Sequence, residues 1–350
     1  MPHSQQSPPP VTVGAMGQHD RARWDDFVQR CPDATFFHRA GWQRVIETAF
    51  GHPTWFLYAE SEGEIRAILP LAQVKSLLFG NTLSSLPFCV YGGIAATDPA
   101  AADAVDRAAQ ALAKRLGVDH LEYRQLRSRH PEWLARDVYA TFRKPLLADP
   151  EHNLLAIPRK HRAMVRKGMA SGLGSHIDAD TTRFFDCYAA SVHRLGTPVF
   201  SRRYFSALQR EFGDDCEVLS IEHAGKAVSS VLSFHFRGEI LPYYGGGGTA
   251  ARALAANDFM YWELMRTAAA RGCRSFDFGR SKVGTGAYDF KKNWGFAPAP
   301  LGYEYRLYGA AAVPENNPLN PKFRLFIGLW RRMPLTLANL LGPHIVKHLG

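Results

Sequence analysis

The segment FDFGRSKVGTGAYDFKKNWGF, from Phe276 to Phe296, concentrates side chains that can carry protons and bind anions. In an extended strand, Asp277 faces the side opposite to the two phenylalanines that flank it, because successive side chains alternate. A carboxylate therefore stands at the end of the strand, and Arg280 and Lys282 follow it closely. We expect both cations to contact a substrate.

A pair of lysines follows a Gly-Thr-Gly turn in the same segment. Lys291 and Lys292 lie between Phe290 and Trp294, and Tyr288 precedes them. Charges among aromatic side chains need a partner or a ligand, because burying a charge without one is costly. We therefore predict the active site in this segment. The alternative is a surface loop that its aromatic residues anchor.

A basic cluster, IPRKHRAMVRKGM, opens the second half of the chain. On a helix, Arg159, Arg162 and Arg166 share one face, a spacing that suits a phosphate chain or a nucleic-acid backbone. We predict that Arg159, Lys160 and Arg162 bind substrate. The alternative is a solvated helix face.

A third candidate region is the run YYGGGG, where a strand leads into a loop and then into a helix that begins near Asn257 or Asp258. Glycines let a backbone approach an anion, and a helix N-terminus supplies free N–H groups. The alternative is a flexible turn. The substrate-binding candidates in this region are Tyr243 and Tyr244. The cofactor-binding candidates are Gly245, Gly246 and Asn257.

The segment KFRLFIGLWRRMPLTLANLLGPHIVKHLG at the C-terminal end mixes apolar and basic residues. Such a segment can lie in a membrane interface near anionic lipids. It can equally form a helix that packs on the first domain. The sequence leaves both alternatives open.

Composition describes a globular protein of 350 residues, 46% hydrophobic, with a net charge of +10 that favours anionic partners. No stretch approaches the roughly 20 apolar residues of a membrane span. The start, MPHSQQSPPP, lacks the pattern of a secretory signal, so we expect a disordered leader on a cytoplasmic protein. Cysteines and histidines have no ligand spacing, which predicts neither a metal site nor a disulfide framework.

An internal repeat organises these candidates. The order strand, strand, strand, helix, strand occurs twice, with helices expected at 100–116 before Gly117 and at 258–271 before Gly272. This order predicts an α+β fold with two tandem domains, each a mixed, mostly antiparallel sheet flanked by helices. We expect a leader at 1–17, domains at 18–149 and 150–312, and a basic apolar tail at 313–350.

Three runs carry a family resemblance: IPRKHRAMVRKGM, AANDFMYWELMRTAAARG and FDFGRSKVGTGAYDFKKNWGF. They resemble the FemAB-like proteins associated with PEP-CTERM/exosortase systems, within the Fem and GNAT-like (acyl-CoA N-acyltransferase-like) superfamily. The resemblance implies two tandem GNAT-like domains and transfer of an amino acid from aminoacyl-tRNA to an amine of a peptidoglycan precursor. It places Lys291 or Lys292 near the acyl donor. The loop GGGGTAARALAAN differs from the compact pyrophosphate loop of coenzyme A-dependent relatives.

The resulting hypothesis is an acyl- or aminoacyltransferase that acts on an amine of a cell-envelope or exopolysaccharide precursor. Asp277 or Tyr288 handles the proton that the amine loses. Lys291, Lys292 and Arg280 hold donor phosphates and stabilise developing negative charge. The donor is aminoacyl-tRNA or acyl-CoA, and no tightly bound cofactor is expected.

The basic cluster at Arg159, Lys160 and Arg162 has a matching role in this hypothesis, since it binds the diphosphate of an acceptor or the tRNA backbone. The protein is expected in the cytoplasm, with peripheral contact at the inner face of an anionic membrane as an open alternative. Two other functions remain: an acyl-CoA-dependent GNAT N-acyltransferase, and a non-catalytic basic adaptor that binds RNA or polysaccharide machinery.

Overall fold

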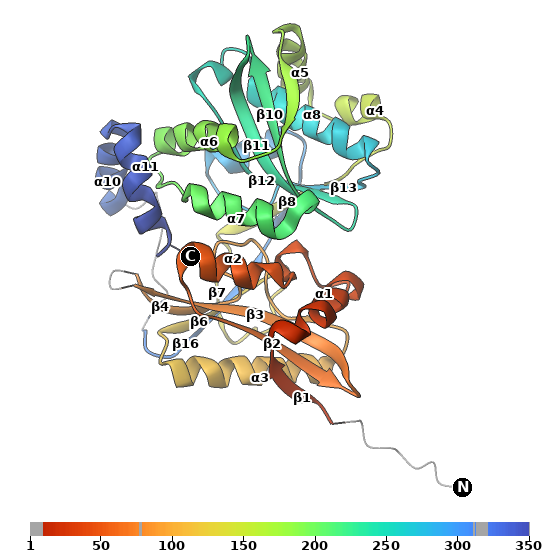
Figure 1. The fold of residues 1–350 in the computed structure, drawn as a ribbon, viewed down its shortest axis with the longest axis vertical. Helices are drawn as coiled ribbons and strands as arrows, with labels where there is room; N and C mark the ends of the chain where they lie inside the picture. The colour runs from red at the N-terminus through yellow and green to blue at the C-terminus, as the bar shows by residue number, and fades with distance from the viewer. Residues whose placement is uncertain (1–9, 77–78, 311, 313–320, 350) are drawn as a thin grey trace. The chain divides into compact units, whose positions relative to one another are not determined.

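A computed structural model describes residues 10–76, 79–310, 312 and 321–349 (Figure 1). The chain divides into two compact units, each built around its own sheet. The described residues of Met1–Glu47, Gly51–Arg136 and Gly302–Pro314 form the first unit. Those of Thr48–Phe50, Asp137–Leu301 and Glu315–Gly350 form the second.

The sheet of the first unit has one parallel strand pair, β4 with β6, among antiparallel neighbours. A short strand, β5 (Ala95–Ala96), pairs with β3 off the main path. In spatial order the strands are β1 (Thr12–Ala15), β2 (Thr54–Ser61), β3 (Glu64–Ser76), β4 (Gly80–Ser84), β6 (His120–Gln125), β16 (Gly302–Leu307) and β7 (Leu134–Ala135).

Helix α3 (Pro99–Leu116) covers the core of the first unit. Asp98 caps its start by accepting from the amides of Ala100 and Ala101, and Gly117 ends it at φ 58°. Its apolar side packs on β2 and β3, where Leu57 and Leu69 belong to the same buried cluster. The other helices of this part of the chain are α1 (Arg21–Arg30) and α2 (Gly41–Phe50), with short 3-10 turns at Gln18–Asp20 and Phe36–His38.

The sheet of the second unit repeats this plan, with one parallel pair, β12 with β13. Strand β15 (Pro298–Pro300) pairs with β8 off the main path. In spatial order the strands are β14 (Ser281–Lys282), β8 (Tyr139–Pro145), β13 (Ser275–Asp277), β12 (Glu239–Gly247), β11 (Lys226–Phe236), β10 (Cys216–His223) and β9 (Gly174–Asp178).

Helices α6 (Thr182–Leu195) and α8 (Ala256–Ala270) cover opposite faces of the second sheet. A side chain added at Gly245 of β12 would meet Tyr261 of α8, and one added at Gly246 would meet Ser191 of α6. Successive residues of a strand point to opposite faces of the sheet, so the two helices lie on opposite faces. The other helices of the unit are α4 (Pro150–Leu155), α5 (Arg159–Ala170), α7 (Arg202–Phe212), α9 (Gly286–Asn293), α10 (Pro321–Arg332) and α11 (Leu335–Val346).

The predicted fold class is confirmed: both units are mixed, mostly antiparallel sheets flanked by helices, in the repeated strand and helix order. The division of the chain differs from the expected join at 149/150. Strand β8 pairs with β13, β14 and β15 of the second unit, and β16 returns to pair with β6 and β7 of the first. Hydrogen bonds between distant residues decide which sheet a strand joins, and strand patterning does not encode them.

The two ends of the chain also differ from expectation. Strand β1 pairs with β2 inside the stretch 1–17 that the sequence assigns to a disordered leader; residues 1–9 of that stretch lie outside the described residues. Helices α10 and α11 contact α6 of the second unit. One of the two alternatives left open by the sequence was a helix that packs on the first domain. None of the described helices has the length and apolar character needed to cross a membrane.

Candidate functional site

Asp277 ends β13 with its carboxylate fully buried. Its Oδ1 accepts from the amide of Gly279 at 2.7 Å and lies 3.4 Å from the hydroxyl of Thr141. Arg143 of β8 brings its Nε within 3.5 Å of Oδ2. These contacts fix the turn that follows the strand, and they surround the carboxylate with protein groups.

Lys291 of α9 also contacts this turn. Its ammonium donates to the carbonyl oxygens of Phe278 at 2.6 Å, Gly279 at 3.1 Å and Arg280 at 3.0 Å. Burial lowers the pKa of Lys291 to about 7, an effect that Asp277 opposes and Arg280 reinforces. Three carbonyls match the three donors of an ammonium, so hydrogen bonding favours the charged form while desolvation favours the neutral amine.

The other candidates of this segment line the surface beside the turn. Tyr288 is half-buried, with its ring edge-on to Phe142 at 5.2 Å between centroids, and the exposed Lys292 holds its Nζ 5.6 Å from the Tyr288 ring. Thr285 caps α9 by accepting from the Tyr288 amide. The structure thus brings Tyr288 and Lys292 together on α9, next to the turn that Lys291 holds.

Tyr139 of β8 organises the two remaining cations. The guanidinium of Arg280 lies 4.8 Å from the centre of the Tyr139 ring. Lys282 of β14 pairs with Tyr139 across the sheet. Both cations are partly exposed and lie within a few residues of the buried Asp277.

A histidine that the sequence did not single out joins α5 to this region. His161 Nδ1 lies 3.0 Å from Oδ1 of Asp258, and the same oxygen accepts from the Trp294 indole at 3.1 Å. The contact holds the first turn of α5, with the exposed Arg159 and Lys160, against the end of α9. A histidine within a basic run and an aspartate at a helix start were the only signals in the sequence.

Arg162, the third basic candidate of α5, turns back toward the end of α4. Its guanidinium donates to the carbonyl of Leu155 at 3.1 Å, and the side chain is half-buried. Arg159 and Lys160 are exposed. The predicted trio is therefore placed as two exposed cations and one that closes the α4–α5 connection.

The glycine run differs from the predicted loop. Gly245 and Gly246 belong to β12, and the space beside them holds Tyr261 of α8 and Ser191 of α6. Glycine suits these positions, because two helices approach the strand closely. Protein side chains therefore fill the place predicted for an anion. Helix α8 begins at Ala256 after Ala255 at φ 54°. Asn257 lies in its first turn, where Oδ1 accepts from the hydroxyl of Ser229 at 2.7 Å.

The two tyrosines that precede the glycines lie in an aromatic cluster. The Tyr244 hydroxyl is 2.9 Å from that of Tyr204 on α7, and its ring is edge-on to Phe205 at 5.3 Å. Tyr243 packs on Phe234 at 5.4 Å and remains half-buried. The cluster attaches β12 to α7, and Tyr244 is 9% exposed.

The first unit contains a cavity of about 550 Å³ at the end of β6, a size typical of ligand sites. Gly92, Gly93, Arg124 and Arg127 are among its lining residues. Arg124 is buried and donates to the carbonyl of Cys89 and to Glu122, whereas Arg127 is exposed. No local sequence pattern indicates this cavity, because its walls come from segments that are far apart in the chain.

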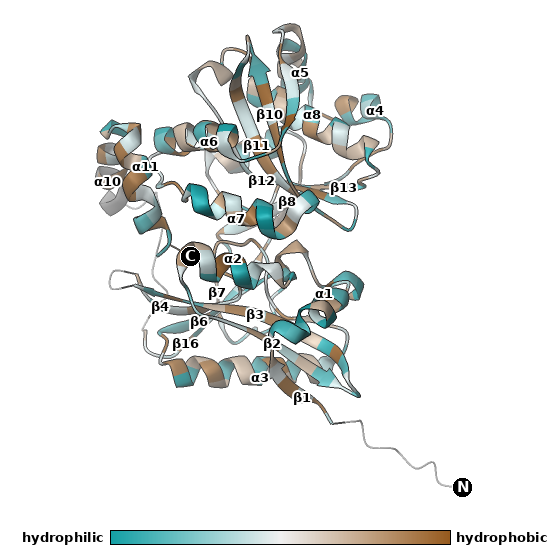
Figure 2. Ribbon diagram, in the orientation of Figure 1, coloured by the Kyte–Doolittle hydropathy of each residue, from teal (hydrophilic) through white to brown (hydrophobic). Residues whose placement is uncertain are grey.

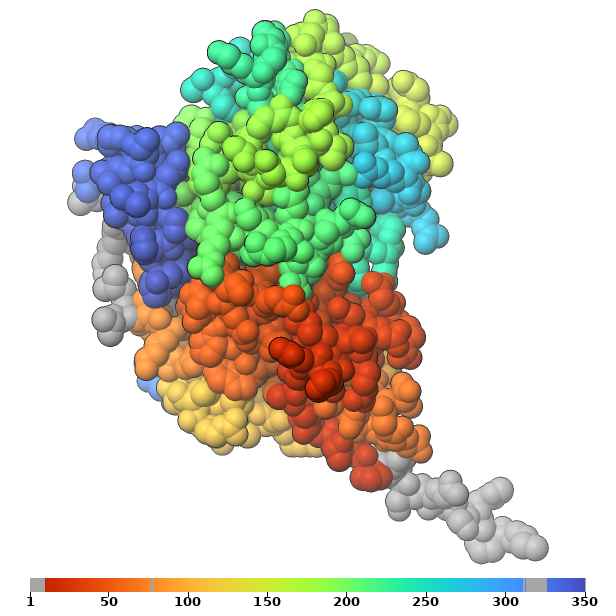
Figure 3. All heavy atoms as spheres, in the orientation of Figure 1, coloured from red at the N-terminus to blue at the C-terminus, as the bar shows by residue number. Residues whose placement is uncertain are grey.

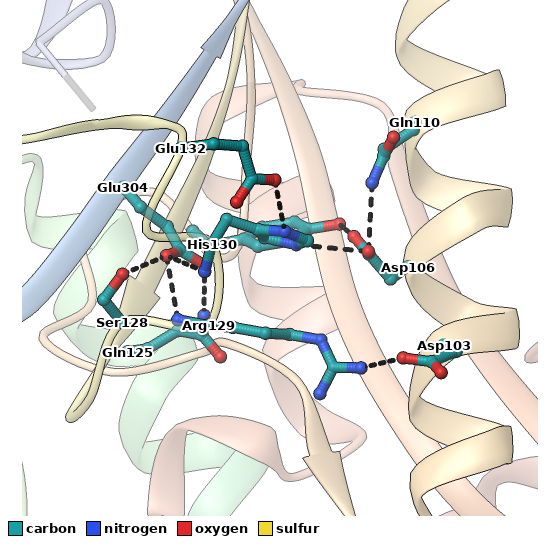
Figure 4. A network of polar contacts seen from close by, with 10 residues as sticks. Asp103, Asp106, Gln110, Gln125, Ser128, Arg129, His130, Glu132 and Glu304 are labelled. Atoms are coloured by element: carbon teal, nitrogen blue, oxygen red, sulfur yellow. Dashed lines mark hydrogen bonds and ion pairs between the residues drawn. The ribbon is translucent and has the colours of Figure 1, made fainter.

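A buried carboxylate fixes the loop beside that cavity (Figure 4). Glu304 of β16 accepts from the side chains of Gln125 and Ser128 at 2.6 Å each, and from the amides of Arg129 and His130 at 2.9 Å each. His130 Nε2 also lies 3.1 Å from a carboxylate oxygen of Asp106 on α3. The loop is therefore attached to both β16 and α3.

In the described parts of the chain, no group of three or more histidine, cysteine, aspartate or glutamate side chains is placed to hold a metal ion. All five cysteines are free thiols, and Cys273 alone among them is not buried.

Residues 159–292 match the model of an acetyltransferase (GNAT) domain family. The structure is similar to that of FemX, with a TM-score of 0.65 and 13% identity over 90% of this chain and 100% of the other. It is also similar to the C-terminal domain (DUF2156) of a putative lysylphosphatidylglycerol synthetase from Agrobacterium fabrum, with a TM-score of 0.56 and 12% identity over 82% and 91%.

A tandem GNAT protein from the clavulanic acid biosynthesis pathway has a TM-score of 0.52 and 14% identity over 87% of this chain and 100% of its own. No curated protein matches the sequence. The matched family segment covers both the basic start of α5 and the Lys291 turn. The chain thus has two tandem GNAT-like folds, and its second unit contains the segment that matches the GNAT domain family.

Proposed function

We propose that this protein transfers an acyl or aminoacyl group from an activated ester or thioester to an amine of an envelope or exopolysaccharide precursor, as the FemAB-like resemblance implies. The observation that carries the proposal is the contact of His161 with Asp258 and of Asp258 with Trp294. It holds the exposed cations of α5 against α9 within the segment that matches a GNAT domain. A transferase of this class needs cations along its donor site, because both donor classes carry phosphates.

The chemistry forms a bond between the acceptor nitrogen and the donor carbonyl carbon, and it breaks the carbonyl bond to the donor oxygen or sulfur. The acceptor amine loses a proton as it attacks, and the donor oxygen or sulfur takes up a proton as it leaves as an alcohol or a thiol. Between the two predicted proton-handling groups, Tyr288 is partly exposed and Asp277 is enclosed by protein atoms. We assign proton handling to Tyr288, and to Asp277 the positioning of the turn.

Donor phosphates are assigned to the partly exposed cations beside that turn, Arg280, Lys282 and Lys292. Lys291 holds three carbonyls and positions the turn, and its pKa near 7 lets it exist in both charge states at neutral pH. Arg159 and Lys160 bind the diphosphate of an acceptor or a tRNA backbone. Aminoacyl-tRNA and acyl-CoA remain the two donor classes, and we place the protein at the inner face of a membrane that holds the acceptor.

The test is a transfer assay with aminoacyl-tRNA and a panel of acyl-CoA donors, in which acylated amines are detected by mass. The double variant Arg159→Ala/Lys160→Ala should raise KM about tenfold or more, since each lost phosphate contact weakens binding. Lys226→Ala, which removes an exposed lysine from the β10–β11 hairpin, is the matched control and should leave KM unchanged. Salt-dependent RNA binding without acyl transfer from any donor would establish the adaptor function instead.

A further inference from the structure

Helix α11 packs in the reverse of the usual amphipathic arrangement. Its buried face consists of Ala338, Gly342 and Val346, spaced four residues apart. On the opposite side, Leu337 is 42% exposed and Leu340 is 65% exposed. A helix at a protein surface normally buries its large apolar side chains and exposes polar ones. This helix buries small side chains and presents leucines to the surroundings.

Close backbone packing explains which face is docked. A side chain at Gly342 would stand 2.8 Å from the amide nitrogen of Val199, closer than real contacts allow. The docked face must therefore be narrow, and the leucines cannot occupy it. The leucine face is fixed outward by the fold.

Helix α10 extends this outward apolar surface. Phe326 is 37% exposed and Leu329 is 59% exposed, while the neighbouring Trp330 is 3% exposed and stacks on Phe326 at 5.4 Å. Arg331 donates to the carbonyl of Leu195 at 3.2 Å, which secures the end of α10 to α6. Figure 2 shows brown, apolar segments on both helices, and Figure 3 shows the two helices, in blue, on the molecular surface.

The charged residues of the C-terminal segment have one sign. Between residues 321 and 349 the sequence contains no aspartate or glutamate, and its charged residues are Lys322, Arg324, Arg331, Arg332 and Lys347. Arg331 and Arg332 are exposed at the junction of the two helices. Exposed leucines flanked by cations match the headgroup and acyl boundary of an anionic bilayer.

We propose that the outward face of α10 and α11, formed by Phe326, Leu329, Leu337, Leu340 and Leu341, docks on an anionic lipid bilayer. This proposal rests on the proposed function, because docking on the bilayer would bring the transferase to an envelope precursor. A second copy of the chain is the competing occupant. Two copies meeting on this face would oppose cations with cations, whereas anionic lipid headgroups neutralise them.

The experiment is co-sedimentation of the full chain with phosphatidylcholine vesicles and with vesicles that also contain phosphatidylglycerol. The wild type should bind the anionic vesicles, and Leu337→Glu/Leu340→Glu should reduce binding about tenfold or more, because both leucines would lose their insertion. Arg332→Glu should weaken binding to the anionic vesicles and should reduce the dependence of that binding on salt concentration. Ile177→Glu, at a 43% exposed site on β9, is the matched control and should bind like the wild type.

Equal binding of Leu337→Glu/Leu340→Glu and the wild type would overturn the proposal, as would failure of the wild type to bind anionic vesicles. A wild-type dimer that Leu337→Glu/Leu340→Glu converts to a monomer would identify a second copy as the occupant, and would also overturn it. Turnover with a water-soluble amine is measured in parallel. A wild type that turns over the soluble amine but does not bind anionic vesicles would contradict this proposal alone, whereas a wild type that binds the vesicles without turnover would contradict the proposed function alone.

Discussion

The loops that follow β6 in the first unit and β13 in the second occupy equivalent places after a parallel strand pair, yet opposite charges hold them. Glu304 holds the first loop by accepting from two amides and two side chains. Lys291 holds the second by donating to three carbonyls. One scaffold therefore carries a loop organised by an anion and a turn organised by a cation.

The difference in sign bears on what each loop can bind. The ammonium of Lys291 offsets the negative ends of three carbonyl dipoles. The electrostatic environment of the turn beside Arg280 and Lys282 therefore stays positive, which suits donor phosphates. The carboxylate of Glu304 occupies the amides of Arg129 and His130 in the first loop. This contrast supports placing the donor in the second unit.

A second contrast concerns two histidines. His130 pairs with Asp106 of α3 and stacks on Trp133 at 4.0 Å, and His161 pairs with Asp258 of α8 near Trp294. Each pair ties a neighbouring segment to the helix between the parallel strands of its unit. The second pair has the exposed cations Arg159 and Lys160 of α5 beside it.

The largest expected effect is on the first loop. Glu304→Ala leaves four donors without their buried acceptor and should lower the free energy of unfolding by on the order of 3 kcal/mol. Chemical denaturation measures the change, with Glu132→Ala, whose side chain is 66% exposed, as the control. A loss below about 1 kcal/mol would show that the carboxylate does not hold the loop.

The second effect is on turnover. Lys291→Met removes the donor to three carbonyls and lets the turn beside Tyr288 shift, so kcat/KM should fall about 100-fold. Lys292→Met, at the exposed neighbour, should cause less than about a tenfold loss, because its ammonium holds no backbone group. Equal losses in both variants would show that the two lysines act through charge alone.

The third effect is a pH dependence of stability. Since the pKa of Lys291 is about 7 in the folded protein and 10.5 in the unfolded chain, the unfolded chain binds more protons between these values. The free energy of unfolding of the wild type, relative to Lys291→Met, should therefore rise with pH from about 7 to 10.5. A rise of at least about 1.4 kcal/mol corresponds to one unit of pKa difference. Parallel pH profiles of the two proteins would contradict the lowered pKa.

The smallest effect separates the two histidines. His130→Asn and His161→Asn should each cost about 1 kcal/mol of stability, because each removes one partly buried contact between an imidazole and a carboxylate. Only His161→Asn should also raise KM, since it releases the first turn of α5 from α9. Melting curves and transfer kinetics on both variants test the contrast, and a raised KM in His130→Asn would place substrate contacts in the first unit.

Several parts of this picture were predictable from local sequence. Gly117 ends α3 and Gly272 follows α8, as the positions of these glycines predict. Lys291 has polar partners, as expected for a charge among aromatic residues. The N-terminus of α8 was less predictable: Ala255 takes a left-handed conformation there, which side-chain preferences for helix caps do not indicate.

The sequence by itself determined the repeated element order, the mixed sheets and the segment in which aromatic and basic residues converge, because periodicity and turn residues act over short distances. Tertiary structure alone decided that β8 and β16 join their present sheets and that Glu304 reaches the loop at Ser128. It also decided that Asp277 is enclosed and that the leucines of α11 face outward. These features depend on packing and hydrogen bonds between residues far apart in the chain, where no local preference of the sequence fixes the partner.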